Sequence, residues 1–313
     1  NIVTKKQLKN SVSTNLETGS FGQLNGSLTV GSELENSSHI IHVGKLTSQG
    51  YRNNSDYNNS NYFIKSVFNK KAQAVEMIAT FFDRKFGAEN FYTTNPAWNE
   101  YEETQNSLIG FTTTFESEKL KIKPRVYWKR NQDMFLLKRN EPNFFRNLHI
   151  TDKMGAEVNA SYSSELGVTG FGVDISKIYI RSNNLGHRNR FMTNVFLEHQ
   201  FKLFNNRLDI TPGVAVTYFS DFKFHAFPGL DIGYRLNDHF KIYGNTGYTY
   251  RIPTYTDLFY SDPGTVGNAN LEPEEALSVE IGSKYISPKF TGSFAFFYRD
   301  ASSLIDYIKE NIA

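Results

Sequence analysis

Short polar turns and long polar segments alternate along this chain, and that order restricts its fold more than any other feature. The short turns are centred on residues 69–71, 116–118, 163–165, 205–206, 237–238 and 287–289. The longer segments span residues 49–60, 88–103, 130–147, 181–188 and 253–275. Between these connections, apolar and polar residues alternate with the period of two that is typical of strands. Tight turns at one end of the strands and long loops at the other are the pattern of an antiparallel barrel that spans a membrane.

Two strands show the alternation most clearly. Within residues 191–202, one face carries Phe191, Val195, Leu197 and Phe201, and the other carries Asn194, Glu198 and Gln200. Within residues 239–251, one face carries Phe240, Ile242, Thr246, Tyr248 and Tyr250, and the other carries Lys241, Tyr243, Asn245, Thr249 and Arg251. We assign the apolar faces to lipid and the polar faces to the lumen of a barrel. The alternation alone also fits a soluble β-sandwich with one face in water.

Aromatic residues separate these two alternatives. They make up 15% of the chain and gather where strands meet the longer segments, as at Phe81-Phe82, Tyr127-Trp128 and Tyr218-Phe219. Rings at one level are expected of the girdle that a barrel places where the membrane meets water. No run approaches the roughly 18 apolar residues of a membrane-spanning helix. There is no cysteine, and a net charge of +2 gives no reason to expect nucleic acid as a partner. We therefore predict an all-β fold, a transmembrane antiparallel up-and-down β-barrel.

Three stretches carry a family resemblance. The first contains Arg251-Ile252-Pro253-Thr254, then Asp257-Leu258, then Gly-Asn-Ala-Asn-Leu-Glu-Pro-Glu from Gly267 to Glu274. This string resembles a signature loop of TonB-dependent outer-membrane receptors. The run from Gly50 to Tyr57 resembles an extracellular loop of the cobalamin-receptor branch of that family. The first six residues, from Asn1 to Lys6, are similar to the segment that closes the plug and enters the barrel.

The resemblance implies a large barrel in the outer membrane of a Gram-negative cell, with a plug domain in its lumen. Residues 1–7 would then be the tail of the plug and the linker, and residues 8–313 would belong to the barrel. Counting from Leu8, we predict about 16 strands, the last beginning near Ser303, out of about 22 in the family's barrel. We expect the plug and the remaining strands to lie outside this chain.

The resemblance also implies active uptake of a scarce nutrient, with a corrinoid such as cobalamin as the first candidate. We expect the ligand to contact Tyr51, Asp56, Tyr57 and Asn58 from one loop, and Tyr255 and Tyr260 from another, because tyrosine offers a broad apolar ring and a hydrogen bond. Energy would come from the TonB complex through the plug, and a surface lipoprotein is a further candidate partner. No enzymatic chemistry is implied. A siderophore, haem or glycan receptor of the same family and a passive porin-like channel are the alternatives.

The loop that contains Asp56 is also a candidate calcium site. No cofactor is required by the proposed activity, but calcium takes six to eight oxygen ligands, and residues 53–61 are rich in Asn, Ser and Asp. Calcium-binding aspartates occur in this loop region of cobalamin receptors, and Asp56 is the one carboxylate offered here. The positions that an EF-hand gives to glycine and glutamate hold Asn61 and Val67, so the loop is not an EF-hand. A solvated polar loop without calcium is the preferred alternative.

Overall fold

The computed structural model describes residues 10–308, except 70–72, 94, 96–97 and 263. The expected plug tail and linker at residues 1–7 lie outside the described residues. Within them, the chain forms sixteen strands and one short helix, α1 (Tyr255–Phe259). No helix in this part of the chain is long and apolar enough to cross a membrane. The all-β prediction is confirmed.

Strands of 9 to 19 residues, together with the two-residue β7, make up the fold. They are β1 (Ser11–Gly19), β2 (Gln23–Glu33), β3 (Ser37–Ser48), β4 (Tyr57–Phe68), β5 (Val75–Gly87), β6 (Tyr101–Thr113), β7 (Phe115–Glu116), β8 (Leu120–Leu136), β9 (Arg146–Ser164), β10 (Gly167–Ser182), β11 (Gly186–Leu203), β12 (Leu208–Phe219), β13 (Lys223–Arg235), β14 (Phe240–Arg251), β15 (Glu274–Ile286) and β16 (Thr291–Ser302).

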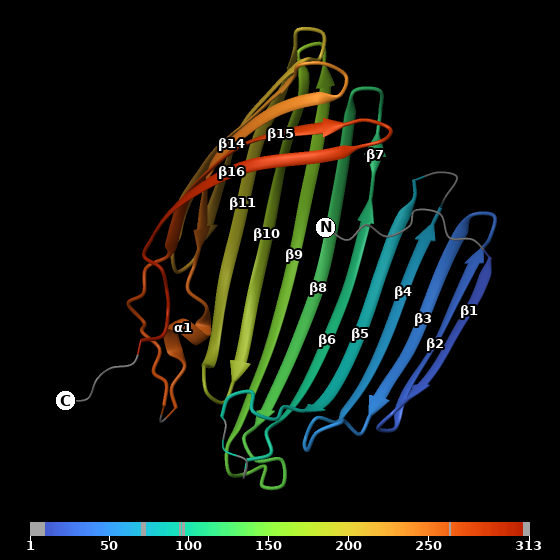
Figure 1. Ribbon diagram of the computed structural model, residues 1–313, viewed down its shortest axis with the longest axis vertical. Coiled ribbons are helices and arrows are strands. Elements are labelled where there is room, and N and C mark those ends of the chain that lie inside the picture. Colours follow the sequence, from blue (N-terminus) through green and yellow to red (C-terminus); the bar gives the residue numbers. More distant parts are fainter. Residues whose placement is uncertain (1–9, 70–72, 94, 96–97, 263, 309–313) are drawn as a thin grey trace. The chain divides into compact units, whose positions relative to one another are not determined.

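All sixteen strands belong to one sheet, and each long strand is hydrogen-bonded to the next one in sequence (Figure 1). The order runs from β1 to β16, and β7 lies off this path and pairs with β8. The pairing is antiparallel, for example between β4 and β5 and between β14 and β15. This is the predicted up-and-down order, in which every connection joins neighbouring strands.

The contacts divide the chain into two compact units, which are described separately below. The first comprises Asn1–Phe115, Lys123–Ala156 and Ser176–Asn189, and the second comprises Glu116–Ile122, Glu157–Ile175 and Arg190–Ala313. The first unit therefore holds β1 to β6, and the second holds β12 to β16 together with β11 from Arg190 onward.

The two faces of the sheet differ in chemistry in the first unit. Val43, Tyr62 and Phe81 lie side by side across β3, β4 and β5, and all three are exposed. The opposite face of the same strands carries polar residues, such as Asn59 opposite Arg84. Since a contiguous band of exposed apolar side chains is a surface for lipid or for a partner, the outward assignment of the apolar face fits this unit.

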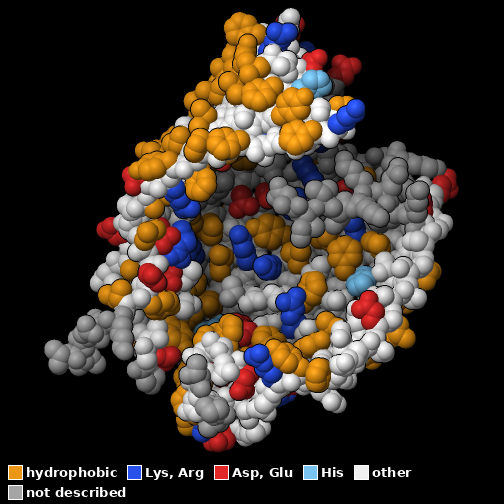
Figure 2. Space-filling view, in the orientation of Figure 1, with side chains coloured by type: hydrophobic (Ala, Val, Ile, Leu, Met, Phe, Trp, Pro, Cys, Tyr) orange, Lys and Arg blue, Asp and Glu red, His pale blue; other side chains and the backbone are white. Residues whose placement is uncertain are grey.

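The second unit shows the same arrangement. Val195 lies beside Val216, and Leu197 lies beside Val214. Val195 and Leu197 are 48% and 54% exposed, values that a packed protein core would not allow. Figure 2 shows hydrophobic side chains gathered over β14 to β16. The exposure of these residues fits the lipid-facing assignment.

Tyr250 differs from the prediction. Its hydroxyl lies 2.8 Å from Nε2 of His225, and the two rings stack with centroids 4.0 Å apart. His225 is paired with Thr217, whose hydroxyl donates to Asn194 over 3.0 Å on the polar face. The pairing of β13 with β14 ends at Gly229 and Gly247, whereas that of β14 with β15 continues to Arg251 and places Tyr250 opposite Glu275. The contacts of the Tyr250 ring nevertheless lie on the polar face, so its assignment to lipid is wrong.

Two connections also differ from the prediction. The segment 181–188 is a turn of three residues between Ser182 and Gly186, not a long loop. The Ser182 hydroxyl accepts hydrogen bonds from the backbone N–H of Asn184 and Leu185, at 3.0 and 2.8 Å, and closes the turn. Residues 303–308 form no strand, so the predicted last strand near Ser303 is wrong over these residues. The structure reaches sixteen strands because it contains the short strand β7 in place of the predicted last strand.

Candidate functional site

The loop between β3 and β4 is folded tightly on itself. Gly50 has φ of +80°, in the left-handed region that favours glycine, and a Cβ there would overlap Ser55. The Ser55 hydroxyl donates to the carbonyl of Arg52 over 2.8 Å and accepts from its N–H over 3.1 Å. The loop is shorter than predicted, residues 49–56, because β4 already begins at Tyr57.

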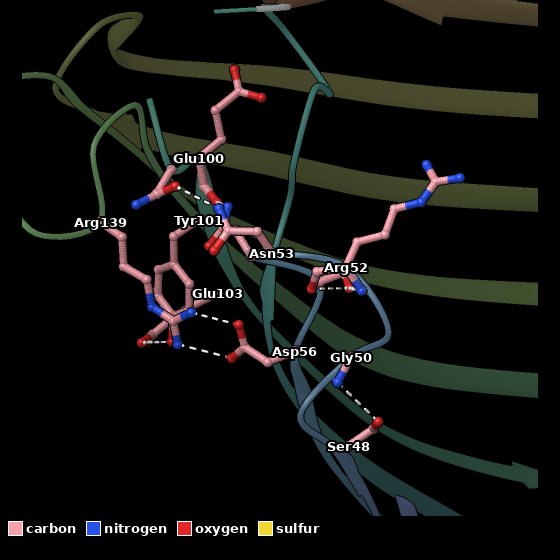
Figure 3. A network of polar contacts seen from close by, with 12 residues as sticks. Ser48, Gly50, Arg52, Asn53, Asp56, Glu100, Tyr101, Glu103 and Arg139 are labelled. Carbon is pink, nitrogen blue, oxygen red and sulfur yellow. Dashed lines mark hydrogen bonds and ion pairs between the residues drawn. The ribbon is translucent and has the colours of Figure 1, made fainter. Parts of the chain in front are cut away.

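Asp56 forms a bidentate ion pair with Arg139, a residue of the loop between β8 and β9 (Figure 3). The two N–O distances are 2.6 and 2.9 Å, and the guanidinium carbon lies 4.4 Å from the centre of the Tyr101 ring. The Tyr101 hydroxyl donates to Glu103 over 2.8 Å, and Glu103 lies 3.6 Å from Lys85. Hydrogen bonding to Asp56 raises the pKa of Arg139, so this guanidinium stays charged.

Glu100 ties the neighbouring loops together. It is wholly buried, and its carboxylate accepts hydrogen bonds from the backbone N–H of Phe91 and Tyr92, at 2.8 and 3.2 Å. Its carbonyl accepts from the Asn54 side chain over 2.6 Å. In the loop between β8 and β9, the backbone N–H of Arg139 donates to the carbonyl of Asn99 over 2.9 Å. The loops 49–56, 88–100 and 137–145 thus form one assembly.

A pocket of about 500 Å³ opens beside this assembly on the polar face of β3 to β5. Its lining includes Asp56 and Tyr57 of the predicted site. The remaining lining residues are Leu46, Ser55, Asn59, Ser60, Asn61, Phe82, Arg84, Phe86 and Gly87. The pocket combines aromatic rings, amides and a guanidinium, the mixture that is typical of a site for an amphipathic small molecule.

Tyr51 and Asn58 do not line this pocket. Tyr51 is 66% exposed, and its ring packs near Phe21 and under the Arg52 guanidinium. Asn58 follows Tyr57 in the strand and points to the opposite face, where it accepts a hydrogen bond from Lys45. The structure therefore brings together Asp56 and Tyr57 from this predicted set and separates the other two from them.

The candidate calcium ligand Asp56 is engaged by protein, since both of its carboxylate oxygens accept from Arg139. Among the described residues, no group of three or more His, Cys, Asp or Glu is arranged to hold a metal ion. A calcium ion at Asp56 would have to compete with a guanidinium for the same two oxygens. Calcium in this loop stays a prediction.

The loop between β14 and β15 is held by its own charged residues. Arg251 pairs with both carboxylate oxygens of Glu274, at 2.6 and 2.7 Å, and joins the end of β14 to the start of β15. Thr254 and Asp257 form a reciprocal capping box that begins α1. The N–H of Asn268 donates to the Asp257 carbonyl over 2.8 Å, which folds the loop back onto the helix. The residues that carried the family resemblance therefore build this loop.

Tyr255 and Tyr260, the predicted ligand contacts of this loop, both contact other protein groups. The guanidinium carbon of Arg190 lies 4.9 Å from the centre of the Tyr255 ring, and the Tyr260 hydroxyl donates to Asp262 over 3.0 Å. Arg190 is buried, forms an ion pair with Asp221 at 2.7 Å, and donates to the carbonyl of Pro253 over 3.3 Å. Tyr255 and Tyr260 belong to the second unit, and Asp56 and Tyr57 belong to the first.

Sequence reasoning missed Arg139, Glu100, Arg84 and Arg190. Arg139 and Asp56 are 83 positions apart, and nothing in either loop signals their pairing. The sequence did contain a signal for Arg84. Alternation places Phe82, Arg84 and Phe86 on one face of a strand next to a loop, and a charged residue at the centre of such a face is unusual for a lipid-facing surface.

Comparison with known proteins agrees with the fold. The family model "TonB dependent receptor-like, beta-barrel" matches residues 8–312. Among solved structures, the siderophore receptor PirA from Pseudomonas aeruginosa is 14% identical with a TM-score of 0.74, and the match covers 93% of this chain and 55% of that one. The hemophore receptor HasR of Serratia marcescens, a double mutant solved with its hemophore HasA and heme, is 12% identical with a TM-score of 0.76, covering 93% and 54%.

The FrpB iron transporter from Neisseria meningitidis is 13% identical with a TM-score of 0.74, and the match covers 93% of this chain and 55% of that one. This chain therefore spans about half the length of these structures. Identities this low show the shared fold, whereas the family model covers nearly the whole chain. The chain belongs to the β-barrel family of the TonB-dependent receptors, which are proteins of the outer membrane.

Proposed function

We propose that this chain forms barrel strands of a receptor that takes up a scarce nutrient across the outer membrane, with energy from the TonB complex. The observation that carries the proposal is the polar pocket beside the three joined loops, on a sheet whose other face is apolar and exposed. Such a sheet separates lipid from an aqueous passage, and loops at the mouth of a barrel bind the ligand. The receptor works by binding and passage, without covalent chemistry.

A corrinoid such as cobalamin is the first ligand that we propose. The resemblance of the run from Gly50 to Tyr57 to a cobalamin-receptor loop supports it, together with the position of Asp56 and Tyr57 in the pocket lining. Iron-siderophore or haem uptake is the second candidate, because solved structures of similar fold are named as siderophore and hemophore receptors. TonB through a plug domain and a surface lipoprotein remain proposed partners.

Growth of an auxotroph tests this function. The receptor of natural length is expressed in a Gram-negative host that requires external cobalamin and has no corrinoid receptor of its own. We expect growth at limiting cobalamin, and loss of that growth when TonB is deleted. Growth that does not depend on TonB would indicate a passive channel. Growth that follows iron-siderophore or haem supply, without corrinoid binding, would overturn the ligand but not the family.

Substitution of Tyr57 tests the site. Tyr57→Ala removes an aromatic ring from the pocket lining, and we expect a loss of binding free energy of about 1–3 kcal/mol, as for aromatic anchors of interfaces. Tyr62→Ala is the matched control, because Tyr62 lies on the same strand, faces the other way and is exposed. Equal effects of the two substitutions on ligand binding would mean that Tyr57 is not a ligand contact.

A further inference from the structure

The pocket beside loop 49–56 carries a positive charge that the described part of the chain does not neutralise. Asp56, an acidic residue of its lining, is already paired with Arg139. The Arg84 side chain, in contrast, forms no ion pair or hydrogen bond with any described residue, and its guanidinium carbon lies 5.7 Å from the centre of the Phe82 ring. An exposed arginine held over a ring beside a cavity is free to bind an anionic group.

The same wall of the pocket offers two amide groups with unmet hydrogen bonds. The Oδ1 atoms of Asn59 and Asn61 are buried and accept no hydrogen bond from the described residues. Asn59 lies directly opposite Arg84, and Asn61 lies opposite Phe82, so all four side chains share one face. An unmet buried acceptor is costly, whereas rotating a terminal amide towards a ligand costs little.

The Asn61 amide has space because the residue next to it on β3 is a glycine. The Asn61 amide lies against Gly44 of the neighbouring strand, and any Cβ at that position would overlap it. The structure therefore keeps room on this face for a polar side chain without giving it a partner. A ligand that donates N–H or O–H groups would supply that partner.

We infer that Arg84, Asn59 and Asn61 form a subsite for a negatively charged oxygen group of the ligand, a phosphodiester or carboxylate, flanked by amide or hydroxyl donors. This inference rests on the proposed uptake function and specifies the chemistry of the ligand. Arg84 binds the anionic oxygens as a charge-assisted donor, and the two amides accept from the neighbouring N–H or O–H groups. Phe82, Phe86 and Tyr57 provide the apolar walls.

Two corrinoids that differ in the nucleotide loop test the subsite. Cyanocobalamin carries that loop, with its phosphodiester, ribose and base, and peripheral carboxamides, whereas dicyanocobinamide keeps the carboxamides but lacks the loop and its negative charge. Binding of both is measured by calorimetry with the receptor of natural length and its Arg84→Gln variant. We expect the substitution to weaken the binding of cyanocobalamin by about 10-fold to 100-fold, because it removes charged hydrogen bonds to the phosphodiester. The binding of dicyanocobinamide should weaken by less than about twofold.

Lys121→Gln is the control. Lys121 lies on β8, does not line the pocket and forms an exposed ion pair with Glu116, so its loss removes the same charge away from the pocket. We expect unchanged binding of both corrinoids. Equal weakening of both ligands by Arg84→Gln, or no weakening, overturns the subsite. So does a lower thermal midpoint of Arg84→Gln alone, because Arg84 would then hold another part of the protein.

Further ligands separate this inference from the proposed function. If the wild-type receptor binds neither corrinoid, the ligand proposed above is wrong, and ferric citrate and haem, which carry carboxylates, are measured with the same variants. Selective weakening of the bound carboxylate ligand by Arg84→Gln supports the subsite, and unchanged binding overturns it. A wild-type receptor that binds none of the four overturns the subsite, and the growth test then decides the uptake function separately.

Discussion

At the scale of single residues, the pair of Asp56 and Arg139 joins two loops that are far apart in the sequence. Both carboxylate oxygens are used, but the side chains are 35% and 37% exposed, so solvent screens the attraction. We expect Arg139→Gln to destabilise the closed arrangement of loops 49–56 and 137–145 by about 1 kcal/mol, because Asp56 loses its partner. Faster hydrogen exchange in both loops would show this.

Lys138→Gln is the control for that substitution. Lys138 precedes Arg139 and contacts Glu141 at 3.5 Å and the Phe144 ring, within its own loop. Its loss should leave exchange in loop 49–56 unchanged. If both variants increased hydrogen exchange in loop 49–56 equally, the cause would be the general loss of charge and not the loss of the pair with Asp56.

At the scale of elements, the loop between β14 and β15 depends on close contact between its two halves. A Cβ at Gly267 would lie 2.8 Å from the Asp257 carbonyl oxygen and from the Phe259 nitrogen, both backbone atoms that cannot easily move. We expect Gly267→Ala to destabilise the packing of α1 by about 1–3 kcal/mol, as overpacking does elsewhere. Protease cleavage within residues 252–273 should become faster.

Gly264→Ala provides the comparison within the same loop. The nearest atom to a Cβ at Gly264 would be Oδ1 of Asp262, at the ordinary contact distance of 3.6 Å. This variant should be cleaved at the wild-type rate. Similar cleavage of both alanine variants would contradict the role assigned to the contact at Gly267.

At the scale of the whole molecule, one face of the sheet meets lipid and the other does not. Leu197→Arg places a charge on the exposed apolar face, which costs about 2–4 kcal/mol near the midplane of a bilayer. Glu198→Arg introduces the same side chain one residue later, on the opposite face. We expect the first variant to lower the yield of folded protein in lipid vesicles and the second to have little effect. The reverse order would contradict the orientation of the sheet.

The sequence by itself determined most of the strands, their order and which side of most of them is apolar. These features depend on neighbours in the chain: the period of two in β11 follows from residues a few positions apart, and the turn between β13 and β14 from Asn237 and Asp238. The turn at Ser182 was misjudged because a side chain–backbone hydrogen bond closes it, and a run of polar residues resembles a longer loop.

Only the tertiary structure decided how the candidate site is assembled. The pair of Asp56 and Arg139, the buried carboxylate of Glu100 and the position of Tyr250 each depend on groups that are brought together by strand register and loop packing. The direction of Tyr57 into the pocket and of Asn58 away from it follows from where β4 begins, which the polar loop sequence does not mark. The strength of an interaction between charged or polar groups depends on the distance between them in space. For residues far apart in the sequence, that distance is set by the complete fold and not by neighbouring residues.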